Sequence, residues 1–73
     1  MEITTARRMQ RCLDKVRKEW GTGWHLLGSR IQQALLAEAL LVEITQQDED
    51  VDPARIVRML NLGWDWINLE GLS

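Results

Sequence analysis

Residues 31–44 read IQQALLAEALLVEI, and this stretch decides the fold. It is long and made mostly of strong helix formers. On a helix of 3.6 residues per turn, its apolar side chains cover two faces, and only a narrow polar strip remains. A helix that is apolar on two sides needs cover on both, so we expect it to lie centrally, between two layers of the rest of the chain. One face carries Leu27, Ile31, Ala34, Leu35, Leu41 and Val42, the other Leu36, Ala37, Leu40 and Ile44, and the polar strip Gln32, Glu43 and Gln46.

The residues before this stretch predict a first helix over 6–20. Apolar residues recur there every three or four positions, which is the spacing of one core-facing side. Two glycines, Gly21 and Gly23, then favour the end of the helix and a reversal of the chain. The apolar positions are Ala6, Met9, Leu13, Val16 and Trp20.

Local end signals fix the other two helices. Ser29 followed by Gln32 resembles a capping box and places the central helix over 30–47. Asp52 followed by Pro53 predicts the capped start of a third helix over 53–68, in which Gly63 is a weak point. The expected core stripe of this third helix is Ile56, Val57, Leu60, Trp64 and Ile67.

Together these segments predict an all-α fold, a compact three-helix domain that spans residues 1–73 with the second helix central. Residues Trp24, Leu26 and Leu27 are too apolar for an idle loop, so we expect them to fold back as a lid on the core. At 73 residues such a domain is close to the size at which one apolar core barely outweighs the entropy lost on folding. We therefore expect that binding to a partner could add to the stability of this domain.

Composition argues against several functional classes. A single cysteine, Cys12, allows no internal disulfide and suits a reducing compartment, and no leader or membrane span is recognisable, so we expect a cytoplasmic protein. His25 stands alone, without a second ligand or a nucleophile at a useful spacing. We therefore expect no enzyme activity, and no metal, cofactor or small-molecule ligand.

Charge is unevenly distributed along the chain. The formal net charge is -2, yet the first thirty residues are basic and the remainder is acidic. The simplest interpretation of the cationic side of the first helix is a face exposed to solvent. The alternative is a surface that binds phosphate groups or an acidic protein. Nucleic-acid binding should then be at most weak and non-specific. The residues concerned are Arg7, Arg8, Arg11, Lys15 and Lys18.

The third helix offers a candidate protein-binding surface. Met59, Leu62 and Trp66 lie off its predicted core stripe, with Arg55 among them, and an exposed tryptophan beside an arginine is typical of an interface anchor. The alternative is that the helix bends at Gly63, or that the tail covers Trp66, and that the tryptophan joins the core.

These observations favour a small non-enzymatic regulatory protein that binds a larger protein. A component of the bacterial transcription machinery such as RNA polymerase is the partner we expect, as for many proteins of phages and mobile elements; a second copy of the chain is another candidate. The alternative is a DNA-binding regulator of the helix-turn-helix kind, in which Arg55, Arg58 and Asn61 would read the DNA.

Overall fold

The computed structural model describes residues 3–71 of the chain, and side chains from residue 5 to residue 70. Every regular element in this part is helical, so the predicted all-α, three-helix fold is confirmed. The elements are α1 (Ile3–Trp20), a 3₁₀ helix η1 (Gly21–Leu26), α2 (Ser29–Gln46) and α3 (Pro53–Gly71).

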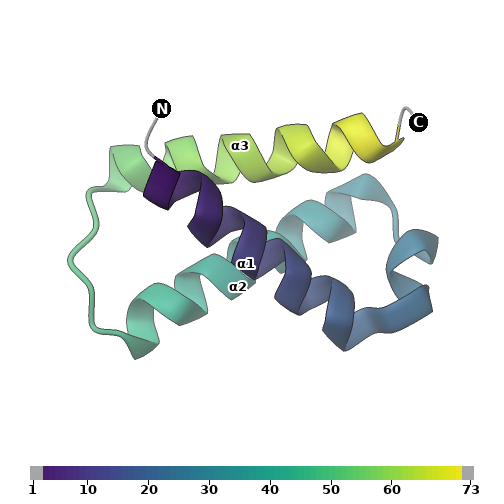
Figure 1. Ribbon diagram of the computed structural model, residues 1–73, viewed down its shortest axis with the longest axis horizontal. Helices are drawn as coiled ribbons and strands as arrows, with labels where there is room; N and C mark the ends of the chain where they lie inside the picture. The colour runs from purple at the N-terminus through teal and green to yellow at the C-terminus, as the bar shows by residue number, and fades with distance from the viewer. Residues whose placement is uncertain (1–2, 72–73) are drawn as a thin grey trace.

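The three helices enclose one core. In Figure 1, α1 crosses α2 while α3 runs along one side of the molecule, and each helix packs against both of the others. The molecule measures 34 × 24 × 19 Å along its principal axes. Its buried hydrophobic residues are Met9, Cys12, Leu13, Val16, Trp24, Leu36, Leu40, Ile44, Met59 and Ile67.

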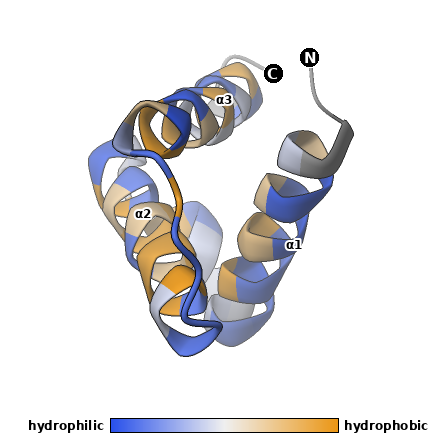
Figure 2. Ribbon diagram, turned by 90° about the vertical axis from the view of Figure 1, so that its left-hand side faces the viewer, coloured by the Kyte–Doolittle hydropathy of each residue, from blue (hydrophilic) through white to orange (hydrophobic). Residues whose placement is uncertain are grey.

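Helix α1 shows the expected two-sided character. Its inward side is orange and its outer side blue in Figure 2, as the three- and four-residue spacing of its apolar positions predicts. Met9, Leu13 and Val16 are buried there as predicted, and Cys12 joins them. Trp20, at the end of the helix, is exposed instead, so its assignment to the core stripe was wrong.

The segment between α1 and α2 folds back as a lid, in which Trp24 is buried and Leu27 packs against the core, as predicted. Trp24 is 1% exposed, and its carbonyl oxygen accepts hydrogen bonds from the Leu27 amide at 3.2 Å and from Nε2 of Gln32 at 2.9 Å. Leu26 is 88% exposed and takes no part in the lid, contrary to the prediction. Because Gln32 binds Trp24, the predicted capping box does not form, and Gly28 precedes α2 without a side-chain cap.

Helix α3 begins where the sequence predicts. Oδ1 of Asp52 accepts a hydrogen bond from the Ala54 amide at 3.0 Å, and Pro53 occupies the first helical position, where no amide proton is needed. The helix then continues past Gly63 to Gly71.

Gly63 marks a close approach between helices rather than a break. It is buried, and a Cβ atom placed on it would overlap Cδ2 of Leu36 and lie 3.0 Å from Cε of Met9. Only a residue without a side chain allows α3 to come this near to α1 and α2. The inward side of α3 therefore centres on Gly63, and its core residues are Met59 and Ile67. Packed against that core are Ile56, Leu60, Trp64 and Trp66.

Helix α2 packs against both neighbours, but they do not enclose it. Leu36, Leu40 and Ile44 are buried, whereas Ile31, Leu41 and Val42 are exposed. The prediction that both apolar faces of this helix are covered was therefore wrong for one of them. Three helices in a triangular arrangement leave each helix with one outward side, and α2 keeps apolar residues on that side.

Candidate functional site

A bidentate ion pair ties α1 to the connector that follows α2. Nη1 and Nη2 of Arg8 donate to Oε2 and Oε1 of Glu49, both at 2.7 Å. The Arg8 side chain is only 12% exposed, so this pair is partly shielded from water. The two parallel hydrogen bonds fix the plane of the guanidinium group as well as its position.

A second carboxylate, Glu43 of α2, faces α1 instead of solvent. It accepts from Arg11 and from Sγ of Cys12, the latter at 3.3 Å, and Nε of Arg8 lies 3.4 Å from its Oε1. Burial alone would raise the pKa of Glu43, but these hydrogen bonds and the nearby arginines outweigh it and hold the pKa below its ordinary value of 4.5. The polar strip on which the sequence places Glu43 is therefore part of the contact with α1.

The same surroundings act on Cys12. Burial, followed by the hydrogen bond to Glu43 and the negative charge of that carboxylate, raises the pKa of the Cys12 thiol to about 12. The thiol is therefore protonated and unreactive at neutral pH.

Beside these ion pairs lies a hollow of about 300 Å³ that we call the arginine hollow. Three of its arginines come from the start of α1 and the fourth from the start of α3, and these two helix ends lie toward the same end of the molecule in Figure 1. The sequence pattern places Arg55 on the candidate protein-binding surface of the third helix, apart from the basic side of the first helix. In the structure, Arg55 lines the same hollow as the arginines of α1. The lining residues are Arg7, Arg8, Arg11, Gln47, Glu49 and Arg55.

The remaining cations of α1 do not join this hollow. Lys15 lines a separate hollow between α1 and α2, Lys18 is exposed, and Arg17 forms an ion pair with Glu70 of α3. The continuous basic face predicted for the first helix is therefore divided. Part of it is neutralised within the molecule, since Glu49 and Glu43 bind Arg8 and Arg11.

The contact surface predicted on α3 does not exist in the expected form. Met59 is fully buried in the core, and Leu62 and Trp66 are half-buried, with Trp66 packed against the core. The reason is the rotation of α3: Gly63, which has no side chain, faces inward and brings Met59 with it, while Val57 turns to solvent. The predicted alternative, Trp66 against the core, describes the structure better, although the helix is not interrupted at Gly63.

An open apolar surface lies instead on the outward side of α2, and we call it the α2 face. Leu41 is 47% exposed and Val42 is 39% exposed there, and they flank a hollow of about 580 Å³. The sequence signal for this face is the run of apolar residues around most of α2. The sequence pattern predicts that this side is buried, whereas in the structure it is exposed. The face is lined by Ala34, Ala37, Glu38, Leu41, Val42, Thr45 and Gln46.

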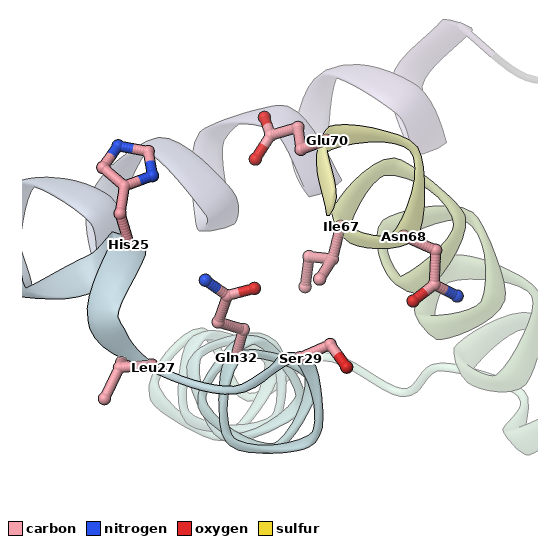
Figure 3. A pocket seen from close by; sticks show the side chains of 7 residues that line it. All are labelled: His25, Leu27, Ser29, Gln32, Ile67, Asn68 and Glu70. Atoms are coloured by element: carbon pink, nitrogen blue, oxygen red, sulfur yellow. The ribbon is translucent and has the colours of Figure 1, made fainter. Parts of the chain in front are cut away.

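A further hollow, of about 570 Å³, opens at the end of the molecule where η1 meets α2 and α3 (Figure 3). Gln32 extends into it from α2, and its side chain is already engaged with the carbonyl of Trp24. His25 lies at its edge, apart from Glu70, and has no hydrogen-bond partner among the described residues. Within residues 3–71, no group of three or more His, Cys, Asp or Glu side chains is placed to hold a metal ion.

Comparison of this chain with protein-family models, with curated proteins and with solved structures gave no match in any of the three. Of the helices described, none combines the length and the apolar character that crossing a membrane requires.

The ion pairs of Glu43 and Glu49 make the free energy of unfolding depend on pH. The hydrogen bond from Arg8 holds the pKa of Glu49 below its ordinary value of 4.5, as the contacts of Glu43 do for that group. A lowered pKa stabilises the fold above the ordinary value, and this stabilisation is lost as the pH falls through the lowered one. We therefore expect the melting temperature to drop on acidification from about pH 5 to about pH 2, and the drop to be smaller in Glu49→Gln.

Circular dichroism melts across this pH range measure the effect. Glu38→Gln, which removes an exposed carboxylate without an ion pair among the described residues, is the matched control. Equal flattening of the pH profile in both variants would contradict a specific contribution from the Arg8–Glu49 pair.

Proposed function

We propose that this protein is a non-enzymatic regulatory protein that binds a larger protein through the α2 face. The observation that carries the proposal is the exposure of Leu41 and Val42 over an apolar hollow on a helix whose opposite side forms the core. Exposed apolar surface of this kind is typical of protein-binding sites. In a domain of this size, burial of that surface by a partner would also stabilise the fold.

The α2 face suits a groove on the partner. Its residues follow the three- and four-residue spacing with which a helix inserts one side into an apolar groove. Ala34 and Ala37 are small and permit close approach, while Leu41 and Val42 supply the larger apolar contacts. Glu38 is the one charged residue of the face, so the partner would place a cation opposite it.

We propose the cytoplasm as the setting and a component of the transcription machinery, such as RNA polymerase, as the partner. Such a partner presents protein surface and nucleic acid side by side. The apolar α2 face would suit the protein surface, and the exposed Arg7, Lys15 and Lys18 of α1 would suit nearby phosphates.

The helix-turn-helix alternative receives less support. Residues 47–52 separate α2 from α3, which is longer than the turn of three or four residues typical of that motif. Arg58 and Asn61 are exposed on α3, but Arg55 lines the arginine hollow, and the exposed Asp48, Asp50 and Asp52 just before α3 would repel a DNA backbone.

The proposal predicts that Leu41→Glu leaves the fold intact and weakens partner binding by about thirtyfold, the effect of losing one interface anchor. Val57→Glu, which places the same charge on an exposed apolar position of α3, is the matched control and should bind as wild type. Affinity capture from a bacterial lysate, followed by binding measurements with purified RNA polymerase, tests both variants.

The outcomes separate the parts of this proposal. Loss of binding in Val57→Glu but not in Leu41→Glu would move the interface to α3. If purified RNA polymerase fails to bind while another protein is captured in a Leu41-dependent way, the α2 face stands and the choice of partner is wrong. Circular dichroism of each variant confirms that the fold is retained.

A further inference from the structure

Arginines outnumber carboxylates among the residues that line the arginine hollow. Four arginines line it, against one lining carboxylate, Glu49. Glu43 contacts Arg8 and Arg11 nearby, so it is a second carboxylate beside the arginines of α1. Arg7 has no carboxylate partner among the described residues. Guanidinium groups held together in this way repel one another unless an anion lies between them.

We propose that the arginine hollow binds a phosphate group, either as free phosphate or as a phosphate monoester. The arginines enter the hollow from two different helices, α1 and α3. A tetrahedral phosphate can accept hydrogen bonds from several guanidinium groups in different directions. A carboxylate is planar, and in the bidentate geometry that Glu49 forms with Arg8 both of its oxygens bind one guanidinium group. This site lies outside the proposed α2 face, and it departs from the sequence-based expectation that no small ligand binds.

The existing ion pairs prepare the hollow for such an anion. Glu49 holds Arg8 in a fixed plane, and Glu43 holds Arg11, so these side chains lose less conformational freedom when a ligand binds. Both arginines keep further N–H donors, because a guanidinium group has five. Arg7, which comes from α1, and Arg55, which comes from α3, also line the hollow.

The surroundings favour a single phosphate over a nucleic-acid backbone. The connector after α2 carries the exposed Asp48 and Asp50, and Asp52 follows at the start of α3. A strand that binds through several successive phosphates would meet these carboxylates, whereas one phosphate in a hollow of about 300 Å³ would not.

Isothermal titration calorimetry with sodium phosphate, at constant ionic strength set by sodium chloride, tests the inference. We expect saturable binding to the wild-type protein, weakened about tenfold or more in both Arg7→Gln and Arg55→Gln, because each removes a charged hydrogen-bond donor. Arg58→Gln is the matched control: it removes an exposed arginine of α3 that does not line the hollow, and it should bind phosphate as wild type. Arg7 is exposed, so its variant keeps the test informative even if Arg55→Gln fails to fold.

Further ligands distinguish the sources of the phosphate. Tighter binding of O-phosphoserine than of inorganic phosphate would assign a monoester, and equal or weaker binding would assign free phosphate. No saturable signal with either, an equal loss in Arg58→Gln, or acetate binding as tightly as phosphate would each overturn the inference. Tighter binding of a short oligothymidylate without terminal phosphate, lost in Lys15→Gln, would overturn it in favour of nucleic acid.

Discussion

Trp24→Ala is expected to lower the free energy of unfolding by about 3–5 kcal/mol, as truncation of a large buried aromatic residue does. Trp24 is among the largest fully buried side chains, and it closes the core at the end where η1 joins α1 to α2. A chain of 73 residues has roughly 4–11 kcal/mol of stability in total. The variant should therefore be partly or largely unfolded at room temperature.

Urea unfolding followed by circular dichroism at 222 nm measures this loss. Leu26→Ala is the control from the same 3₁₀ helix, since Leu26 is exposed and should change the stability by less than about 0.5 kcal/mol. Similar losses in the two variants would mean that η1 does not cover the core as described.

Gly63→Leu is expected to destabilise the fold by roughly 3 kcal/mol or more, through overpacking where the three helices meet. Even a single added carbon would overlap Cδ2 of Leu36, which is fully buried, and would lie 3.0 Å from Cε of Met9. Gly28→Ala is the matched control, because a Cβ atom at Gly28 meets nothing within 4 Å. The same urea titration reports both variants.

The sign of Gly63→Ala should depend on residue 36. In the wild-type chain the overlap with Leu36 should outweigh the gain of about 1 kcal/mol in helix propensity, so the substitution destabilises. In a Leu36→Ala background the overlap is gone, and the same substitution should stabilise. Sucrose can be added throughout to keep the weakened variants folded. Destabilisation by the same amount in both backgrounds would show that Gly63 is needed for another reason.

The helices themselves could be predicted because their signals are local. Asp52 and Pro53 start α3 through contacts within one turn, and the spacing of Met9, Leu13 and Val16 marks the inward side of α1. The burial of Trp24 followed from its apolar character in a short connection between two helices. Each of these inferences needs only residues that are close together in the sequence.

The inward sides of α2 and α3 were harder to predict, for two different reasons. Apolar residues surround most of α2, so hydrophobic periodicity cannot say which of its faces meets the core. In α3 the inward side contains Gly63, which adds nothing to an apolar stripe. The predicted stripe is right for Ile56, Leu60, Trp64 and Ile67, but it includes the exposed Val57 and leaves out the buried Met59. The core position of Met59 depends on how closely the helices approach, which periodicity does not record.

The arginine hollow could not be predicted because it depends on distant residues. Arg8 and Glu49 are 41 positions apart, and Arg55 reaches the same place from another helix. A helical wheel puts Arg8 on the solvent side of α1, and only the path of the connector brings a carboxylate over it. The sequence indicates the cationic residues of α1, but it does not indicate which of them line the same hollow.

The buried thiol of Cys12 can report when the core of the unmodified protein opens. Because Cys12 is enclosed and its pKa is about 12, alkylating reagents that attack only an accessible thiolate can modify it only when the helices separate. Its rate of alkylation therefore counts opening events of the core, in the way that slow amide hydrogen exchange does. With only one cysteine in the sequence, a single mass increase identifies each molecule that has opened, and no engineered label is needed.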